Sequence, residues 1–243
     1  MFVLPLSATE LLDAASICRG SGVPDKGIYL ATLGMTEQSF EACAALPIGT
    51  RDASILALRQ AMFGDQIELS ATCPQCAARL DVATTATALL AIERATDSPS
   101  CDVTIDGRRF DVRPINSVDL AAIGQIPDAE EARIELARRC LVPPEGEELP
   151  ILLEAADVDA IGAVIARIDP AGDPYAMLRC AECACEWDAP IDIANVLARE
   201  IEGAAEALLD EIHLLAQAYH WSEGAILALG QDRRRAYLAR LQQ

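Results

Sequence analysis

Two Cys-x-x-Cys pairs, widely separated along the chain, constrain its fold more than any other feature. The first pair spans residues 73–76 and the second residues 180–183. Two thiolates separated by two residues can bind one tetrahedral ion from a tight turn, and two such turns complete the four-sulfur shell of a structural zinc site. Alternating apolar residues precede each pair, and a short strand-like and then a helix-like stretch follow it. The pattern therefore predicts two related half-sites that converge on one zinc ion, with the ligands Cys73, Cys76, Cys180 and Cys183.

Two other states of these cysteines are open at the level of sequence: disulfide bonds and buried free thiols. The chain has nine cysteines, and its first residues lack the basic start and long apolar run of a signal peptide. This favours a reducing compartment, where matched Cys-x-x-Cys pairs usually bind metal. The residues after the two pairs, Ala77 and Ala184, count against zinc, because zinc knuckles often place glycine there to adopt a positive φ.

Composition favours a predominantly helical α+β fold. The 243-residue chain is 52% hydrophobic but only 4% aromatic, so alanine and aliphatic residues must form its core. We expect residues 1–65 to be an N-terminal helical region. Ser7 and Glu10 form a capping-box pattern before an apolar periodic stretch. Further helices are expected at residues 36–46 and 51–63.

Residues 66–198 are expected to form a mixed α/β region that contains both Cys-x-x-Cys half-sites. Asp106-Gly107, between two alternating apolar stretches, predicts a tight hairpin turn. Three similar strings end strand-like stretches just before helix starts: residues 80–82, 110–112 and 187–189. Chance can produce such short similarities. The alternative that we favour is one small sheet whose strands lead into helices on its faces.

Residues 199–243 are expected to form a C-terminal helical module with a basic end. Apolar residues at helical spacing between residues 201 and 219 predict a helix with one wide apolar face, and two shorter helices follow. Cations are favoured near a helix C-terminus, which is the simplest account of the arginines in the last helix. The alternative is a docking patch for an acidic partner, formed by Arg233, Arg234, Arg235 and Arg240.

Charge and motifs disfavour several classes of function. A formal net charge of −19 repels nucleic acid and anionic membranes and suits contact with basic protein surfaces. The sequence has no apolar run long enough to cross a bilayer and no glycine-rich phosphate loop or catalytic serine motif. Its two histidines, His213 and His220, are too far apart on one predicted helix to form the usual metal pair. We therefore expect neither enzyme activity nor a small-molecule substrate.

Several short strings, in order along most of the chain, carry a likeness to a known family. They are residues 46–52 (LPIGTRD), 58–59, 63–64, 73–76, 209–216, 219–223, 226–229 and 233–238. In these strings the chain resembles the phage T4-type baseplate protein family, whose members are described as hub assembly proteins or hub assembly chaperones. Alanine in place of glycine at Ala77 and Ala184 weakens the prediction of a zinc site more than it weakens the family resemblance.

The resemblance implies a non-enzymatic assembly chaperone or scaffold for the baseplate hub of a contractile phage tail or injection system. Its partners would be baseplate hub or hub-proximal tail proteins. Its place would be the cytoplasm of the producing bacterium during assembly, or the tail baseplate itself. Two alternatives are a stoichiometric structural subunit of the mature baseplate and a zinc-stapled adaptor or regulator unrelated to tails.

Overall fold

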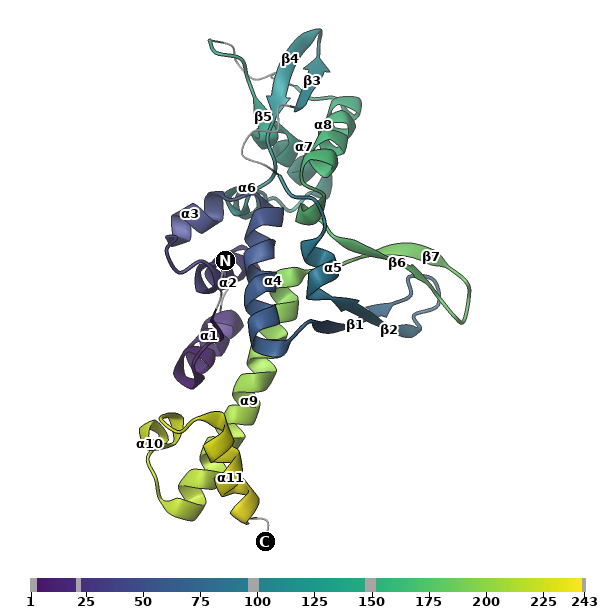
Figure 1. The fold of residues 1–243 in the computed structure, drawn as a ribbon. Helices are drawn as coiled ribbons and strands as arrows, with labels where there is room; N and C mark the ends of the chain where they lie inside the picture. Colours follow the sequence, from purple (N-terminus) through teal and green to yellow (C-terminus); the bar gives the residue numbers. More distant parts are fainter. Residues whose placement is uncertain (1–3, 21–22, 96–100, 147–151, 242–243) are drawn as a thin grey trace.

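The computed structural model describes residues 4–20, 23–95, 101–146 and 152–241. Its helices, small antiparallel sheets and cysteine-bearing hairpin turns confirm the predominantly helical α+β class. Figure 1 shows a central helical body, a lobe at one end, a helical module at the other and a pair of hairpins that project sideways. Among the described helices, none has both the length and the apolar character needed to cross a membrane.

The central body packs the N-terminal helices against the first half of a long helix, α9. The helices are α1 (Ala8–Gly20), α2 (Val23–Gly34), α3 (Phe40–Ala45), α4 (Ile48–Phe63) and α9 (Ile193–Tyr219). Their apolar faces share one buried core, in which Leu30, Leu58 and Leu197 are fully enclosed. The expected capping box is confirmed at the start of α1, because the Ser7 backbone N–H donates to Glu10 and the Glu10 N–H donates to the Ser7 hydroxyl.

Two hairpins extend from the central body. One consists of β1 (Gln66–Thr72) and β2 (Arg79–Thr85), and it leads into the short helix α5 (Ala86–Leu90). The other consists of β6 (Tyr175–Arg179) and β7 (Glu186–Pro190), and it leads into α9. Residues alternate in exposure along all four strands, as expected when each ribbon has one sheltered and one solvated face. The two ribbons run outward together in Figure 1.

A separate lobe lies between the hairpins in sequence. It contains a sheet of β3 (Cys101–Ile105), β4 (Arg108–Val112) and β5 (Leu141–Val142), with α6 (Ser117–Ile123), α7 (Ala129–Cys140) and α8 (Ala155–Ile168) around it, followed by the short 3-10 helix η1 (Pro170–Gly172). The predicted hairpin turn is confirmed, because Asp106 and Gly107 have φ of 51° and 73°. Phe110 and Ile161 are buried in a core that belongs to this lobe alone.

The C-terminal module is built on the second half of α9. Leu208 and Leu215 of α9 pack with α10 (Glu223–Leu227) and α11 (Gln231–Leu241), as the apolar face predicted. Trp221 lies at the turn after α9 and stacks on Tyr219, with ring centroids 4.8 Å apart. This turn is possible because His220 adopts the left-handed conformation at the helix end, with φ of 55°.

One expectation about organisation needs correction. The strands do not form one sheet: the described strands make three separate antiparallel sheets, because each hairpin pairs with itself and β3–β4 adds only β5. The described residues pack around three hydrophobic cores. The hairpins and α5 belong to the central core, residues 101–168 have their own core, and α9 spans two cores.

Candidate metal centre

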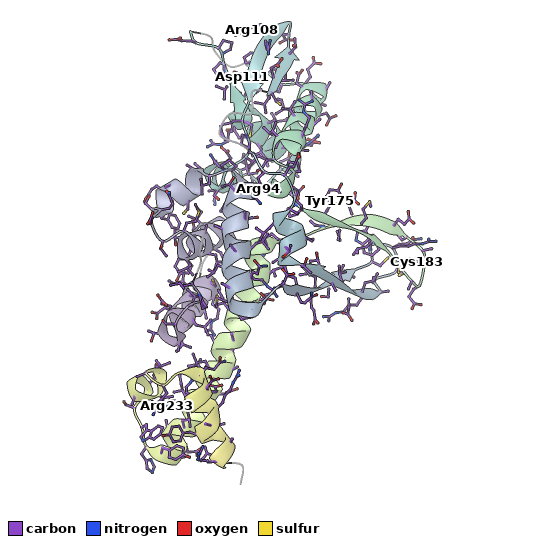
Figure 2. The ribbon with its side chains drawn as sticks, in the orientation of Figure 1. Arg94, Arg108, Asp111, Tyr175, Cys183 and Arg233 are labelled. Carbon is purple, nitrogen blue, oxygen red and sulfur yellow. The ribbon has the colours of Figure 1, made fainter. Side chains whose placement is uncertain are left out.

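The two Cys-x-x-Cys pairs form the tips of the two projecting hairpins. In the first hairpin the last strand pair is Thr72 with Arg79, and in the second it is Arg179 with Glu186. The intervening turns therefore have the same length and contain residues 73–78 and 180–185. Figure 2 shows Cys183 at the outer end of the two ribbons. Two segments that are distant in sequence thus meet at one place.

The two turns share one backbone conformation. The Cys73 N–H donates to the Ala78 carbonyl and the Ala77 N–H to the Cys73 carbonyl, at 2.8 and 3.0 Å. The equivalent bonds of the second turn, from Cys180 and Ala184, measure 2.9 and 3.0 Å. Ala77 and Ala184 have φ of 59° and 57°. Alanine therefore adopts the positive φ that zinc knuckles usually assign to glycine, at a cost of about 1–2 kcal/mol per residue.

The four predicted sulfur atoms converge. The Sγ atoms of Cys73 and Cys183 are 3.6 Å apart, those of Cys76 and Cys180 are 3.5 Å apart, and all four lie within 4.8 Å of one another. Tetrahedral bonds of about 2.3 Å from zinc to sulfur would place sulfur atoms about 3.8 Å apart. A disulfide bond is about 2.05 Å long, and the cysteines are all free. The prediction that these cysteines meet at one metal-sized site is confirmed.

Electrostatics within the cluster suit a cation. Burial opposes ionisation of Cys73, but N–H groups of Cys76 and Gln75 and the Cys183 thiol donate to its sulfur and lower its pKa to about 6. The Ala78 N–H favours the Cys76 thiolate, yet the neighbouring Cys183 and Cys180 sulfurs raise the pKa of Cys76 to about 12. Sulfurs this close cannot all ionise unless a cation neutralises them. A bound divalent ion would supply that charge.

Exposure of the four sulfurs is uneven. Cys73 and Cys180 are buried, Cys183 is half-buried and Cys76 is exposed. A fifth cysteine, Cys185, follows the second pair, and burial together with the nearby Cys73 sulfur raises its pKa. A metal ion bound by all four thiols would have a complete tetrahedral shell, with no coordination position left for a substrate. Such an arrangement can join two hairpins.

The arginines of α11 do not share one environment. Arg234 is 6% exposed, its Nε donates to Glu211 at 3.0 Å, and its Nη1 donates to the Leu229 carbonyl. It therefore packs inside the module, contrary to the expectation of an exposed donor. Arg233, Arg235 and Arg240 are exposed. Figure 2 shows Arg233 in the C-terminal module, far from the cysteine centre.

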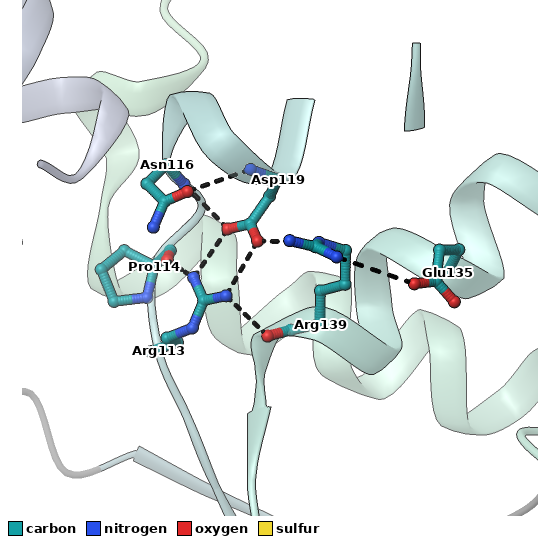
Figure 3. Close-up of polar contacts among 6 residues, drawn as sticks. All are labelled: Arg113, Pro114, Asn116, Asp119, Glu135 and Arg139. Carbon is teal, nitrogen blue, oxygen red and sulfur yellow. Dashed lines mark hydrogen bonds and ion pairs between the residues drawn. The ribbon is translucent and has the colours of Figure 1, made fainter. Parts of the chain in front are cut away.

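Sequence reasoning missed a buried polar network in the lobe, which Figure 3 shows. The Asp119 carboxylate accepts hydrogen bonds from Arg113 at 2.7 and 2.9 Å, from Arg139 at 3.0 Å and from the Asn116 backbone at 3.1 Å. Arg113 also donates to the Arg139 carbonyl at 2.7 Å. These bonds fix α6 and α7 to the end of β4. The available signal was Asn116 three residues before Asp119, which is a capping pattern.

Two further buried arginines join α4 to other helices. Arg59 of α4 makes a bidentate pair with Glu200 of α9, at 2.9 and 2.7 Å. Arg51 donates to Asp52 and to the Ser117 hydroxyl of α6, at 2.7 and 2.8 Å. Burial raises the pKa of Asp52 to about 6, although Arg51 acts in the opposite direction. These arginines lie in the strings that carry the family resemblance, where they support the fold.

The two histidines take no part in the cysteine centre. Both are exposed, and they lie near the end of α9 in the C-terminal module. Comparison with protein-family models, curated proteins and solved structures finds no match to the chain. The function is therefore proposed from the geometry of the chain and from its sequence resemblance.

Proposed function

We propose that the cysteine centre holds a structural zinc ion that links the tips of the two hairpins. The observation that carries this proposal is the convergence of Cys73, Cys76, Cys180 and Cys183 within 4.8 Å. Each hairpin is a two-stranded ribbon, which is marginally stable by itself in water. A metal that binds both tips would contribute folding energy directly, because the folded chain brings the ligands together and the unfolded chain does not.

Zinc is the metal that the donor set favours. Four thiolates in tetrahedral geometry suit zinc or iron, and they are poor ligands for magnesium or calcium. The N–H groups that point at the Cys73 and Cys76 sulfurs would support thiolates in either case. Elemental analysis of protein purified without chelators separates the two metals. One zinc per chain supports the proposal, and one iron, with the visible absorption of an iron–thiolate centre, contradicts it.

We further propose that the chain is a non-enzymatic assembly chaperone for the baseplate hub of a contractile tail. Support comes from the resemblance at residues 46–76 and 209–238 and from the net charge of −19, which suits protein partners with basic surfaces. The shape adds to this, because a lobe, a hairpin pair and a helical module extend from one central body and expose three separate surfaces (Figure 1). Such a frame can hold partners in a fixed arrangement.

Co-expression tests this assignment. The tagged chain is produced with a complete contractile tail gene cluster, and captured proteins and purified tails are identified by mass spectrometry. A chaperone should capture a hub or hub-proximal protein from the cells and be absent from finished particles. Stoichiometric recovery in the particles would instead identify a structural subunit. Capture of no tail protein at all would contradict both roles and favour an adaptor outside tail biology.

A further inference from the structure

A cleft of about 640 Å³ lies where the C-terminal module meets the central body. One wall is formed by the N-terminal segment with α1 and by the end of α4, which contribute Leu6, Leu11 and Phe63. The other wall is the connection from α10 to α11, with Leu227. The side chains of these walls are mostly apolar and half-buried, so they expose apolar surface to the cleft.

The floor of the cleft is α9. Ala204 and Ala207 lie on the floor with Leu208, and their short side chains give the cleft its depth. At the rim, a Cβ atom built on Gly230 would meet no atom within 4 Å, so the rim is also open. The depth and width accommodate a few side chains of another molecule.

The charges along the cleft define what it can accept. Its charged lining residues are Glu211, Arg234 and Arg235. Glu211 and Arg234 pair with each other at 3.0 Å, so their charges offset one another. Arg235 is exposed, and its guanidinium makes no hydrogen bond or ion pair within the described part of the chain. The cleft therefore has a net positive lining in a chain whose net charge is −19.

We propose that this cleft docks a short apolar segment of a partner protein that carries a carboxylate opposite Arg235. The apolar walls would bury the leucine-like side chains of the segment, and the free guanidinium would form a charge-assisted pair with its acidic group. A basic segment would meet the unpaired charge of Arg235 with repulsion. The inference rests on the proposed assembly function, since the segment would belong to the hub protein.

A direct test uses short random peptides displayed on phage particles and selected on the purified chain. Peptides that also bind the Ala207→Glu variant are removed, because this variant places a longer side chain and a negative charge on the cleft floor. The matched control is Ala218→Glu, which makes the same exposed change on α9 outside the cleft. We expect enriched peptides that combine large apolar residues with Asp or Glu and that bind the Ala218→Glu variant as well as wild type.

Charge exchange tests the role of Arg235. For an enriched peptide, Arg235→Gln should raise the Kd about tenfold or more, as loss of one charge-assisted bond predicts. Arg240→Gln, the same change on an exposed arginine of α11, should leave the Kd unchanged. A peptide with its acid changed to Lys should bind Arg235→Glu better than it binds wild type. Thermal melts by circular dichroism check that every variant is folded.

Several results would overturn the proposal. The proposal fails if no selected peptide binds wild type more tightly than Ala207→Glu, or if the selected peptides are basic. It also fails if Arg235→Gln and Arg240→Gln weaken peptide binding equally. If wild type forms a dimer or copurifies with a fatty acid, and Ala207→Glu abolishes that dimerisation or that binding, the cleft has another occupant. Failure of the assembly function is a separate outcome. If wild type captures a hub protein and Ala207→Glu captures it equally, only the cleft proposal fails; if wild type captures none, the assembly function fails.

Discussion

Replacing Asp119 by Asn should destabilise the lobe strongly. The Asp119 side chain is 1% exposed, and its carboxylate forms ion pairs with both Arg113 and Arg139. The amide of Asn is nearly isosteric, but it removes the negative charge and points a donor at guanidinium donors. The two arginine side chains are 35% and 31% exposed. Water can therefore reach them in part, and their unpaired charges are less costly than fully buried ones.

Removal of one partner from a buried ion pair costs roughly 3–5 kcal/mol. Because both arginines keep some contact with water, we expect the lower end, a loss of about 3 kcal/mol. For a chain of this size, this corresponds to a fall in the melting temperature of roughly 6–12 °C. Urea unfolding followed by far-UV circular dichroism measures the change.

The matched control is Asp102→Asn. Asp102 pairs with Arg109 at 2.9 Å, but the two side chains are 37% and 73% exposed. An exposed pair contributes about 0–1 kcal/mol, so this variant should unfold close to wild type. If Asp119→Asn and Asp102→Asn had equal and small effects, the Asp119 network would not hold the lobe together, and the reasoning from burial would be refuted.

The same network predicts a dependence on pH. Burial acts to raise the pKa of Asp119, but the bonds from Arg113, the Asn116 backbone and Arg139 outweigh it and lower the pKa below its ordinary value. The carboxylate therefore stabilises the fold above its unfolded pKa of about 3.9, and this contribution is lost as pH falls through the folded pKa. The difference in unfolding free energy between wild type and Asp119→Asn should be constant from neutral pH to about 4 and should narrow below it. If this difference in unfolding free energy does not narrow at a pH well below the folded pKa of Asp119, the prediction is wrong.

Three further predictions concern other parts of the chain. Ala77→Gly and Ala184→Gly should each raise stability by about 0.5–1 kcal/mol, since relief of the positive φ exceeds the entropy added to the unfolded chain; a lower melting temperature would contradict this. Leu208→Asp should cost several kcal/mol in urea unfolding, whereas Leu209→Asp, at an exposed position on the same helix, should cost little; equal losses would show that burial does not govern this helix. Gly203→Ala should raise the melting temperature, because alanine stabilises a helix interior by about 1 kcal/mol relative to glycine and a Cβ at this position meets no atom within 4 Å. A fall in the melting temperature would mean that a neighbouring group occupies that space.

Local signals allowed much of the fold to be predicted. The capping pattern at Ser7, the Asp-Gly turn at residues 106–107 and the periodicity of residues 201–219 each act within a few residues, and each is confirmed. The metal cluster was also predictable, although its partners are distant in sequence. Each pair requires a second pair to complete a tetrahedral shell. This chemical requirement predicted the long-range contact between the two pairs, which hydrophobic periodicity could not predict.

Other features depend on packing that no local pattern encodes. The three similar strand ends suggested one sheet, but strand pairing is decided by which faces can be buried. The two cysteine hairpins pack on the central core, whereas β3 and β4 pack in the core of the lobe. Arg234 resembled its exposed neighbours in sequence, but its side chain is buried because it bonds to Glu211 on α9 and to the Leu229 carbonyl. The helix of residues 201–219 begins earlier, at Ile193, because the start of α9 packs in the central core.

Three buried arginines give a structural role to the strings on which the proposed baseplate resemblance rests. Arg51, Arg59 and Arg234 lie in the strings that carry the likeness, and each is less than 8% exposed and joined to a carboxylate. A buried charge without its partner costs several kcal/mol, so such positions tolerate few replacements. The arginines in these strings therefore help to hold the fold together.

X-ray absorption at the metal edge tests the central claim most directly, on protein purified without chelators. The account predicts one zinc per chain, with four sulfur neighbours at about 2.3 Å. Cys180→Ser should abolish this spectrum and lower the melting temperature, because metal binding is coupled to folding. Cys101→Ser, at a half-buried cysteine outside the centre, should leave the spectrum unchanged. A metal-free chain that is fully folded, or a metal with nitrogen or oxygen neighbours in place of the four sulfurs, would contradict the account.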